Sequence, residues 1–143
     1  MAKKTIKFEV VTPERIVLKQ QILQVTVPTE DGEITVLPEH IPLMSILKPG
    51  VIEIKLEDGE LELISVSGGF VEVMRDKIVI LADTAERADE LDEAIIEEAR
   101  ARAEERKKEL ENVDEVQFAN IAVQLEKEMA RLKALTRWRR LKK

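Results

Sequence analysis

The spacing of apolar residues changes near residue 82, and this change constrains the fold more strongly than any other feature of the sequence. Before it, apolar and polar side chains alternate, for example over residues 6–10 and 52–56. A period of two is typical of strands that bury one face. After it, apolar residues recur at helical spacing among Ala, Glu, Arg, Lys and Leu. The sequence therefore predicts an α+β chain, with strands first and helices second.

Turn-forming residues divide the first part of the chain into many short strands. Asp58-Gly59 separates two alternating runs, 52–56 and 61–63, and predicts a hairpin in which both turn residues have φ > 0. Pro49-Gly50 and Arg75-Asp76 mark further turns, and residues 78–81 form a wholly apolar strand. Frequent turns between short strands are typical of a sandwich or barrel. We expect an antiparallel β-sandwich over residues 1–84.

The second part of the chain, residues 85–143, predicts an antiparallel hairpin of two helices. The first helix is expected from about residue 90 to residue 110, with Asp89 as its N-cap. Residues 112–114 form the expected turn, and Asp114 is the expected N-cap of the second helix. A short connection between helices favours antiparallel packing. The second helix has an apolar face formed by Phe118, Ile121, Ala122, Leu125, Met129, Leu132 and Leu135.

Small side chains dominate the apolar stripe of the first helix, which contains Ala94, Ala99, Ala101 and Ala103. Alanine buries little apolar area, and buried area stabilises by only ~25 cal/mol per Å². Isolated helices of this length are marginally stable in water, so packing must hold them in place. We therefore expect a hairpin that docks weakly on the sandwich and can leave it.

Charge and composition exclude several classes of protein. The formal net charge of −6 argues against a general nucleic-acid binder. The chain has no cysteine, so disulfides and thiolate metal sites are excluded. No apolar run reaches the length of about 18 residues that is typical of a membrane-spanning helix. The first residues show no signal or transit pattern, so we expect a bacterial cytoplasmic product without a metal site.

The charges are distributed unevenly, because the chain ends in a basic segment. No acidic residue follows position 130, and the basic residues there are Arg131, Lys133, Arg137, Arg139, Arg140, Lys142 and Lys143. Three roles remain open for this segment: a solvated helix end, a contact with an acidic protein surface, and binding to anionic lipid or RNA.

Residues 28–43 form the most distinctive stretch of the chain, with three prolines, one glycine and the only histidine. Because proline fixes φ and lacks an amide hydrogen, Pro38 and Pro42 cannot both lie inside a paired strand. The segment is therefore a rigid connection. His40 is expected to be a structural turn residue or to lie at a subunit contact, since no catalytic constellation surrounds it in the sequence.

This connection resembles the signature loop of the ε subunit of the F-type ATP synthase, whose mitochondrial counterpart is called δ. The matching residues are Pro28, Gly32, Leu37, Pro38, His40, Pro42 and Leu43. Residues 12–15 resemble the family's early turn, residues 67–73 its Gly-Gly-Phe-Val-Glu-Val run, and residues 81–88 its segment between sandwich and helices. The four matches occur in the family's order and extend the resemblance over nearly the whole chain.

The resemblance implies a ten-stranded sandwich that contacts the γ subunit of the central stalk and the membrane rotor ring. It also implies a hairpin that folds down on the sandwich or extends along γ, and that blocks ATP hydrolysis when extended. The chain would be a non-catalytic rotor subunit of a proton- or sodium-translocating enzyme, peripheral to the cytoplasmic face of the bacterial membrane. Its hairpin would contact the catalytic β and α subunits, with the basic segment facing acidic segments of β.

The resemblance also implies roles for particular residues. Docking of the sandwich is expected within residues 33–43 and 68–73, and the expected contact residues are Gly32, Glu33, Pro38, His40, Pro42, Gly68, Gly69 and Phe70. Inhibition of hydrolysis is expected to involve Arg131, Arg137, Arg139 and Arg140. Without the resemblance, the glycine pair indicates a bulge or tight bend, because the rest of a phosphate-loop pattern is missing.

The sequence departs from the family pattern at a nucleotide motif and in the signature loop. Some bacterial members bind ATP through an Ile/Leu-Asp-x-x-Arg-Ala motif. The corresponding residues here are Leu91, Asp92, Ile95 and Ile96. An isoleucine cannot supply the guanidinium that pairs with a phosphate, so we expect ATP to bind weakly or not at all, and expect no cofactor. Thr35 and Glu39 stand where the family often has glycine, so the local shape of the loop is open.

Two other classes of function remain open. In the first, the chain is a free-standing β-sandwich adaptor whose basic C-terminal helix binds anionic membrane or nucleic acid. In the second, it is an enzyme, although the sequence offers no partner constellation for His40. Salt-sensitive binding to anionic vesicles or RNA, without any ATPase partner, would favour the adaptor.

Overall fold

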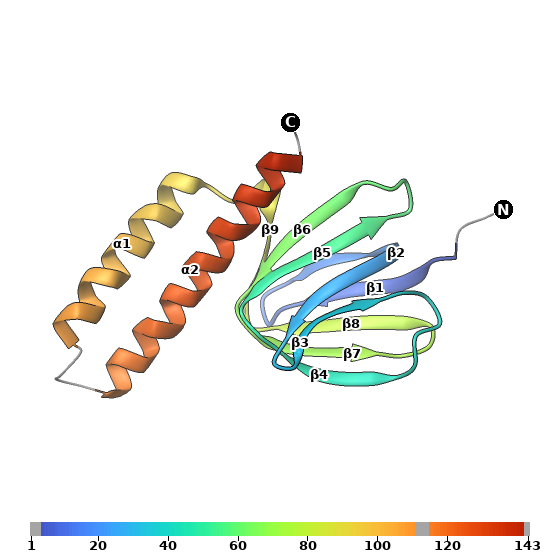
Figure 1. Ribbon diagram of the computed structural model, residues 1–143, viewed down its shortest axis with the longest axis horizontal. Helices are drawn as coiled ribbons and strands as arrows, with labels where there is room; N and C mark the ends of the chain where they lie inside the picture. Colours follow the sequence, from blue (N-terminus) through green and yellow to red (C-terminus); the bar gives the residue numbers. More distant parts are fainter. Residues whose placement is uncertain (1–3, 111–114, 142–143) are drawn as a thin grey trace.

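The computed structural model describes residues 4–110 and 115–141 and shows a β-sandwich with two helices beside it (Figure 1). The strands are β1 (Ile6–Val11), β2 (Ile16–Thr29), β3 (Gly32–Val36), β4 (Leu43–Leu47), β5 (Gly50–Leu56), β6 (Leu61–Val66), β7 (Gly69–Val73), β8 (Lys77–Ala82) and β9 (Ala85–Arg87). A 3₁₀ turn, η1 (Ala88–Glu90), then leads to α1 (Glu93–Leu110) and α2 (Glu115–Leu141). The predicted α+β class is confirmed.

The strands form two layers that share the long strand β2. Its first half pairs with β1, and its second half pairs with β3 and β5. The pairing shifts between Ile22 and Gln24, where a bulge bends the strand from one layer to the other. One layer contains β1, β8, β7 and β4, and the other contains β3, β5, β6 and β9. The described residues form nine strands rather than the ten that the resemblance implies, because β2 is continuous through this bend.

The inward sides of both layers form one aliphatic core. Alternation along each strand buries Phe8, Val25, Ile52, Ile64 and Ile80 completely. The pairing is antiparallel, as expected, except between β1 and β8, which are parallel. No direct hairpin joins these two strands, so the connection does not force them to be antiparallel.

The predicted hairpin between β5 and β6 is present, but its turn differs from the expected one. Gly59 has φ 87°, whereas Asp58 is not among the described residues with positive φ. The connection spans residues 57–60, and the amide of Leu56 donates to the carbonyl of Glu60. A longer connection of this kind does not require positive φ at both central residues, so the expectation for Asp58 was wrong.

The outer face of the β5–β6 pair is covered as well as its inner face. Ile64 and Val66 point into the core, whereas Leu63 and Val51 are buried on the opposite side, in a second apolar cluster that includes Ala134 of α2. The alternation at 61–63 therefore continues toward the helices and not toward the sandwich core. A strand buried on both faces explains the nearly continuous burial of β6.

The first helix begins at Glu93, and Asp92 rather than Asp89 is its N-cap. The Asp92 Oδ1 atom accepts hydrogen bonds from the amides of Ala94 (2.9 Å) and Ile95 (3.4 Å). Asp89 lies instead in η1, which buries Ala88 against the sandwich. At residues 88–90 the chain therefore still packs against the sandwich, where the sequence pattern predicts the start of a helix.

The two helices pack together, and α2 lies between α1 and the sandwich (Figure 1). The hairpin is thus confirmed, while its turn at 112–114 and the Asp114 cap lie outside the described residues. Leu125 and Leu135 of the predicted apolar face are buried, but Met129 is 60% exposed. Glu128, Ala130 and Ala134 are buried instead, because α2 contacts neighbours on two sides and has no single inward face.

The sheet continues past residue 84, the expected end of the sandwich. Strand β9 adds three residues, 85–87, that pair antiparallel with β6. Of the four alanines expected to line the first helix, Ala103 is buried and Ala99 half-buried, whereas Ala94 and Ala101 are exposed. Among the described residues, no helix is both long and apolar enough to cross a membrane.

Candidate docking surfaces

Large apolar side chains are exposed in a row across the outer face of one layer. Strand register places Ile46 opposite Phe70, and Phe70 opposite Leu81. These three residues, which we call the apolar row, are 46%, 53% and 51% exposed, and Met44 on the same face is 66% exposed. Contiguous exposed apolar groups of this kind mark an interaction surface more often than isolated ones do.

The sequence predicted only one member of the apolar row. Phe70 was an expected contact residue, whereas Leu81 was expected only as the last residue of a wholly apolar strand, and its side chain is exposed. The strand alternates inward Ile78 and Ile80 with outward Val79 and Leu81. Apolar residues on both faces of a strand indicate that both faces are covered when the protein is bound to its partners. This pattern in β8 would have predicted Leu81 as a contact residue.

The glycine pair shapes the backbone beneath the apolar row. Gly69 has φ 130°, and a Cβ atom there would lie 2.0 Å from the carbonyl oxygen of Leu81. Only glycine therefore allows β7 to begin so close to β8. Gly68, with φ 139°, forms the predicted bend. These positions fix the start of the strand that presents Phe70.

The expected contact residues fall into two groups at opposite ends of the sandwich. Gly32 is opposite Thr29, Thr29 is opposite Leu47, and Leu47 is opposite Gly69. Gly32 and the exposed Glu33 therefore lie at the same end as the glycine pair.

Pro38, His40 and Pro42 lie at the other end, where β4 begins. They follow the far end of β3, and the neighbouring Leu43 is opposite Val73 at the far end of β7. The structure thus separates this loop from Gly32, Glu33 and the glycine pair. Their roles as contact residues stay predictions.

The loop 37–42 is held by its own backbone and presents apolar side chains to solvent. The His40 amide donates to the Leu37 carbonyl (3.2 Å), and His40 Nδ1 donates to the Ile41 carbonyl (2.7 Å). Leu37 and Ile41 are 52% and 75% exposed. His40 therefore takes part in the turn, while its role at a subunit contact stays a prediction, and the side chains of Leu37 and Ile41 beside it are exposed.

The two positions where the family often has glycine behave differently. Thr35 lies in regular strand β3, and its hydroxyl is 2.9 Å from that of Thr26 on β2. Glu39 has φ 68° and is the only non-glycine residue with positive φ in the described ranges. Its carboxylate pairs with Lys4 at the surface (3.1 Å). The departure from glycine therefore strains the loop at Glu39 alone.

The hairpin rests on the outer face of β5 and β6 through a small apolar cluster. Its buried members are Val51, Leu63, Ala88 and Ala134, with Leu91 and Trp138 packed against them. Two of the four buried residues are alanines, so this contact removes little apolar area from water.

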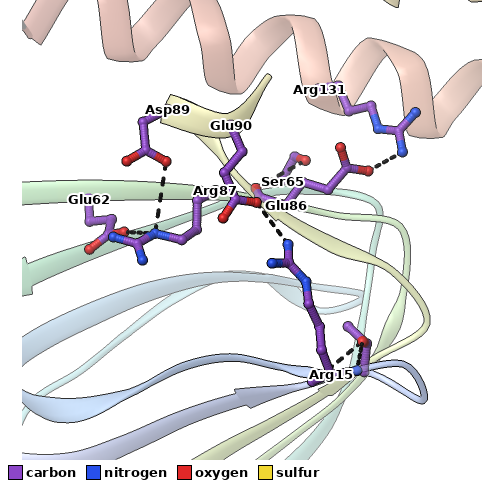
Figure 2. A network of polar contacts seen from close by, with 9 residues as sticks. Arg15, Glu62, Ser65, Glu86, Arg87, Asp89, Glu90 and Arg131 are labelled. Carbon is purple, nitrogen blue, oxygen red and sulfur yellow. Dashed lines mark hydrogen bonds and ion pairs between the residues drawn. The ribbon is translucent and has the colours of Figure 1, made fainter. Parts of the chain in front are cut away.

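Arg131 of α2 connects the hairpin to β9 (Figure 2). Its guanidinium donates to the Glu86 carboxylate and, through Nη1, to Glu128 on its own helix (2.7 Å). Glu128 is 1% exposed and also accepts a hydrogen bond from Gln124 (2.8 Å). This glutamate was not singled out from the sequence, since burial of a charged side chain depends on the arginine and glutamine beside it.

Two further arginines of α2 are also paired within the chain. Arg137 donates to Glu53 on β5, and Arg139 pairs with Glu93 at the start of α1 (2.6 Å). Arg140 is exposed. Three of the four arginines expected to act in inhibition therefore have carboxylate partners when the hairpin lies on the sandwich.

A second set of ion pairs ties η1, and the strand β9 just before it, to the rest of the sandwich beneath the hairpin (Figure 2). Arg15, in the turn between β1 and β2, pairs with Glu90 (2.8 Å), and Arg87 pairs with Glu62 on β6. The hydrogen bond from Arg15 lowers the pKa of Glu90 below its ordinary value, while partial burial opposes this shift.

Comparison with known proteins assigns the family. The family model described as "ATP synthase, Delta/Epsilon chain, beta-sandwich domain" matches residues 5–88. The chain belongs to this delta/epsilon family. An ATP synthase epsilon chain of Chloroflexus aggregans is 51% identical over 98 residues, which cover 68% of this chain and 70% of the relative. An ATP synthase epsilon chain of Desulforamulus reducens is 43% identical over 131 residues, which cover 92% of this chain and 97% of the relative.

The fold of this delta/epsilon chain is also found in a solved assembly, the mitochondrial ATP synthase of Euglena gracilis described as OSCP/F1/c-ring. The match has a TM-score of 0.79 and 24% identity, and it covers 92% of this chain and 81% of the other. The resemblance stated from the sequence is thereby confirmed at the level of family and fold.

The residues at the positions of the nucleotide motif differ in their surroundings. Asp92 uses its carboxylate to cap α1, Ile95 is 64% exposed, and Ile96 is buried at 3% exposure. Leu91 packs against the apolar cluster under the hairpin. Within residues 4–110 and 115–141, no group of three or more His, Cys, Asp or Glu residues could hold a metal ion.

Proposed function

We propose that this chain is a non-catalytic central-stalk subunit of an F-type ATP synthase that translocates protons or sodium ions. It couples the γ subunit to the membrane rotor ring and restrains ATP hydrolysis through its C-terminal hairpin. Membership of the delta/epsilon family supports this proposal, as do relatives named ATP synthase epsilon chain that match over nearly the whole chain. As part of that complex, the chain would lie peripherally at the cytoplasmic face of the bacterial membrane.

The apolar row is the observation that carries the proposal. Ile46, Phe70 and Leu81 expose large side chains on a regular strand face, which is unfavourable in water unless a partner covers them. The hairpin covers the other layer, over β5 and β6 (Figure 1). The apolar row is therefore open to γ even while the hairpin is docked.

The remaining surfaces fit the other expected partners. The loop 37–42 offers the exposed Leu37 and Ile41 beside a rigid backbone, and we assign it to the rotor ring. The arginines of α2 provide charge that is complementary to an acidic surface of the catalytic β subunit. The adaptor alternative needs a basic helix that is open to lipid or RNA, whereas Arg131, Arg137 and Arg139 are paired within the chain.

The test is binding of the full chain to a cognate complex of α, β and γ. Phe70→Glu places a charge at the centre of the apolar row, and we expect the affinity to fall at least about tenfold because the carboxylate would be desolvated against an apolar surface. Ile41→Glu is the matched control, since Ile41 is 75% exposed in the loop that we assign to the rotor ring, and the ring is absent from this complex. Equal affinity of Phe70→Glu and the control would contradict the proposal.

A further inference from the structure

The arginines of α2 are already neutralised by this chain, and the partners are unequally placed. Glu128 and Glu93 belong to the hairpin itself and move with it. Glu53 on β5 and Glu86 on β9 belong to the sandwich and pair with Arg137 and Arg131. Among the ion pairs of these α2 arginines within residues 4–110 and 115–141, these last two join the hairpin to the sandwich and must break when the hairpin leaves it.

We propose that Glu53 and Glu86 form an internal acidic surface that takes the place of an acidic partner protein. They hold Arg137 and Arg131 while the hairpin is docked, so docking and contact with the partner exclude each other. The docked state is therefore set by the sandwich's own carboxylates and requires no bound ligand. The identity of the partner, an acidic surface of the catalytic subunits, rests on the proposed function; the internal contact does not.

Partial burial leaves these two pairs less screened than fully exposed surface pairs. The side chains of Arg131 and Glu86 are 20% and 29% exposed, and those of Arg137 and Glu53 are 34% and 32% exposed. Partial burial reduces screening by water and salt, and a charge left behind at a broken pair must be resolvated. The pairs are thus able to decide the position of the hairpin.

Within the apolar cluster beneath the hairpin, α2 contributes one fully buried side chain, Ala134, and the partly buried Trp138. Ala88 and Ala134 supply half of the cluster's buried residues, and alanine contributes little buried area. The ion pairs flank this cluster, with Arg131 and Arg137 on the same helix as Ala134. Removing the two sandwich carboxylates should therefore release the helix, while the core of the sandwich remains intact.

Glu128 keeps Arg131 ready for a second partner. It lies three residues before Arg131 on the same helix, so the two side chains stay neighbours wherever the helix moves. The Arg131 guanidinium bridges Glu128 and Glu86 through different nitrogens when docked. On release, the nitrogen that faced Glu86 becomes available to a carboxylate from another protein.

Trp138 reports the position of the hairpin directly. It is the only tryptophan in the chain and packs against the cluster that contains Val51 and Leu63. Its emission should shift to longer wavelength when α2 leaves the sandwich and water reaches the indole. Fluorescence of the full chain alone therefore measures docking without any partner.

The decisive variant is the double substitution Glu53→Gln with Glu86→Gln, compared with Glu9→Gln. Glu9 pairs with Lys77 (3.3 Å) and Lys19 (3.7 Å) on the sandwich, has a similarly half-buried side chain, and does not contact the hairpin. We expect the undocked fraction to rise about five- to tenfold in the double variant, given the usual strength of such pairs, and to stay unchanged in the control. Unaltered far-UV circular dichroism would show that both remain folded.

Ionic strength provides a second measurement on the same proteins. Raising the salt from about 0.05 M to about 1 M shortens the Debye length to ~3 Å and should shift Trp138 emission of the natural chain toward that of the double variant. The double variant should respond much less. Emission that is equal in the double variant and in Glu9→Gln would overturn the proposal.

Reversing the charges of the Glu53–Arg137 pair distinguishes undocking of the hairpin from unfolding of the protein. Glu53→Arg places two cations opposite each other and should undock the hairpin, and adding Arg137→Glu should restore docking. Failure of the exchanged pair to restore Trp138 emission would also overturn the proposal, because a specific ion pair must be recoverable with its charges reversed.

Hydrolysis by the cognate α, β and γ complex separates this inference from the proposed function. If docking and partner contact exclude each other, the Glu53→Gln and Glu86→Gln double variant should inhibit more strongly than the natural chain. An emission shift without deeper inhibition would overturn the exclusion. Absence of inhibition by every form of the chain would instead refute the proposed restraint of hydrolysis, with the internal contact still judged by fluorescence.

Discussion

At the scale of single residues, backbone strain at Glu39 predicts that one substitution stabilises the protein. Glu39 adopts φ 68°, which glycine adopts without a Cβ clash. We expect Glu39→Gly to raise the free energy of unfolding by about 1 kcal/mol. The lost Lys4 pair offsets little of this, since both side chains are more than 70% exposed. Urea unfolding measures the change.

A glutamate in ordinary strand conformation serves as the control for that substitution. Glu33 is exposed in β3 and is not among the residues with positive φ. Glu33→Gly should lower the free energy of unfolding by about 0.5–1 kcal/mol, because glycine weakens a strand. If both substitutions change stability in the same direction, strain at Glu39 is not the cause.

The altered nucleotide motif predicts that ATP binds weakly or not at all. Ile95 brings no guanidinium, and the Asp92 carboxylate already accepts two backbone amides at the start of α1. Titration calorimetry of the isolated chain should show no micromolar site. Ile95→Arg, which restores the motif's cation, is the comparison. A micromolar dissociation constant for the natural chain would show that other residues replace the arginine.

Sequence patterns predicted individual residues well where local chemistry decides, and poorly where tertiary contacts decide. The acidic residues near the start of the first helix follow from local signals, although the cap itself is Asp92. Phe70 was expected only through the family resemblance, and its role as a contact residue stays a prediction. Leu81 and Glu128 do not follow from local signals, because each has the opposite exposure from that suggested by its polarity. Their environment depends on which neighbour lies across the strand or beside the helix, and one sequence does not specify this.

At the scale of elements, the turn η1 is the joint between sandwich and hairpin, and its ion pair predicts a pH effect. The pKa of Glu90 is lowered, chiefly by the hydrogen bond from Arg15. Ionised Glu90 therefore stabilises the fold above its ordinary pKa of 4.5, and this contribution is lost as pH falls through the lowered value. For an exposed pair we expect ~0.2–1 kcal/mol.

Urea unfolding from pH 7 to pH 3 measures this effect. The natural chain should be more stable than Glu90→Gln near neutral pH, and the two should converge at the acidic end. Glu14→Gln is the control, since Glu14 is an exposed acid in the same turn as Arg15. A constant difference between the natural chain and Glu90→Gln at all pH values would exclude ionisation of Glu90 as the source.

The elements themselves were predictable in kind, but their junction was not. Period two and period 3.6 distinguish strands from helices on either side of residue 82. Between them, residues 85–90 contain enough acids and alanines for a helix start, yet they form β9 and η1. Pairing of β9 with β6 and burial of Ala88 favour an extended path there, and tertiary contacts override the weak helical propensity.

At the scale of the whole molecule, the two layers of the sandwich have different neighbours. The hairpin covers the outer face of β5 and β6, whereas the apolar row on β4, β7 and β8 is open. Both outer faces carry apolar residues in the sequence, so alternation alone does not say which one the hairpin occupies. The ion pairs from α2 to Glu53 and Glu86 select the β5–β6 face.

This arrangement predicts separate effects on binding and on inhibition when the hairpin is removed. A version that ends at Ala88 keeps all nine described strands and the apolar row, so it should still bind the cognate complex of α, β and γ. It lacks the four arginines, so it should no longer inhibit ATP hydrolysis, whereas the full chain should. Steady-state hydrolysis with each form measures inhibition, and co-sedimentation measures binding.

If both forms bind and neither inhibits, the chain couples γ to the ring but its hairpin has no restraining role. If neither binds, the stalk assignment fails and the adaptor alternative leads, with salt-sensitive binding to anionic vesicles or RNA as its own test.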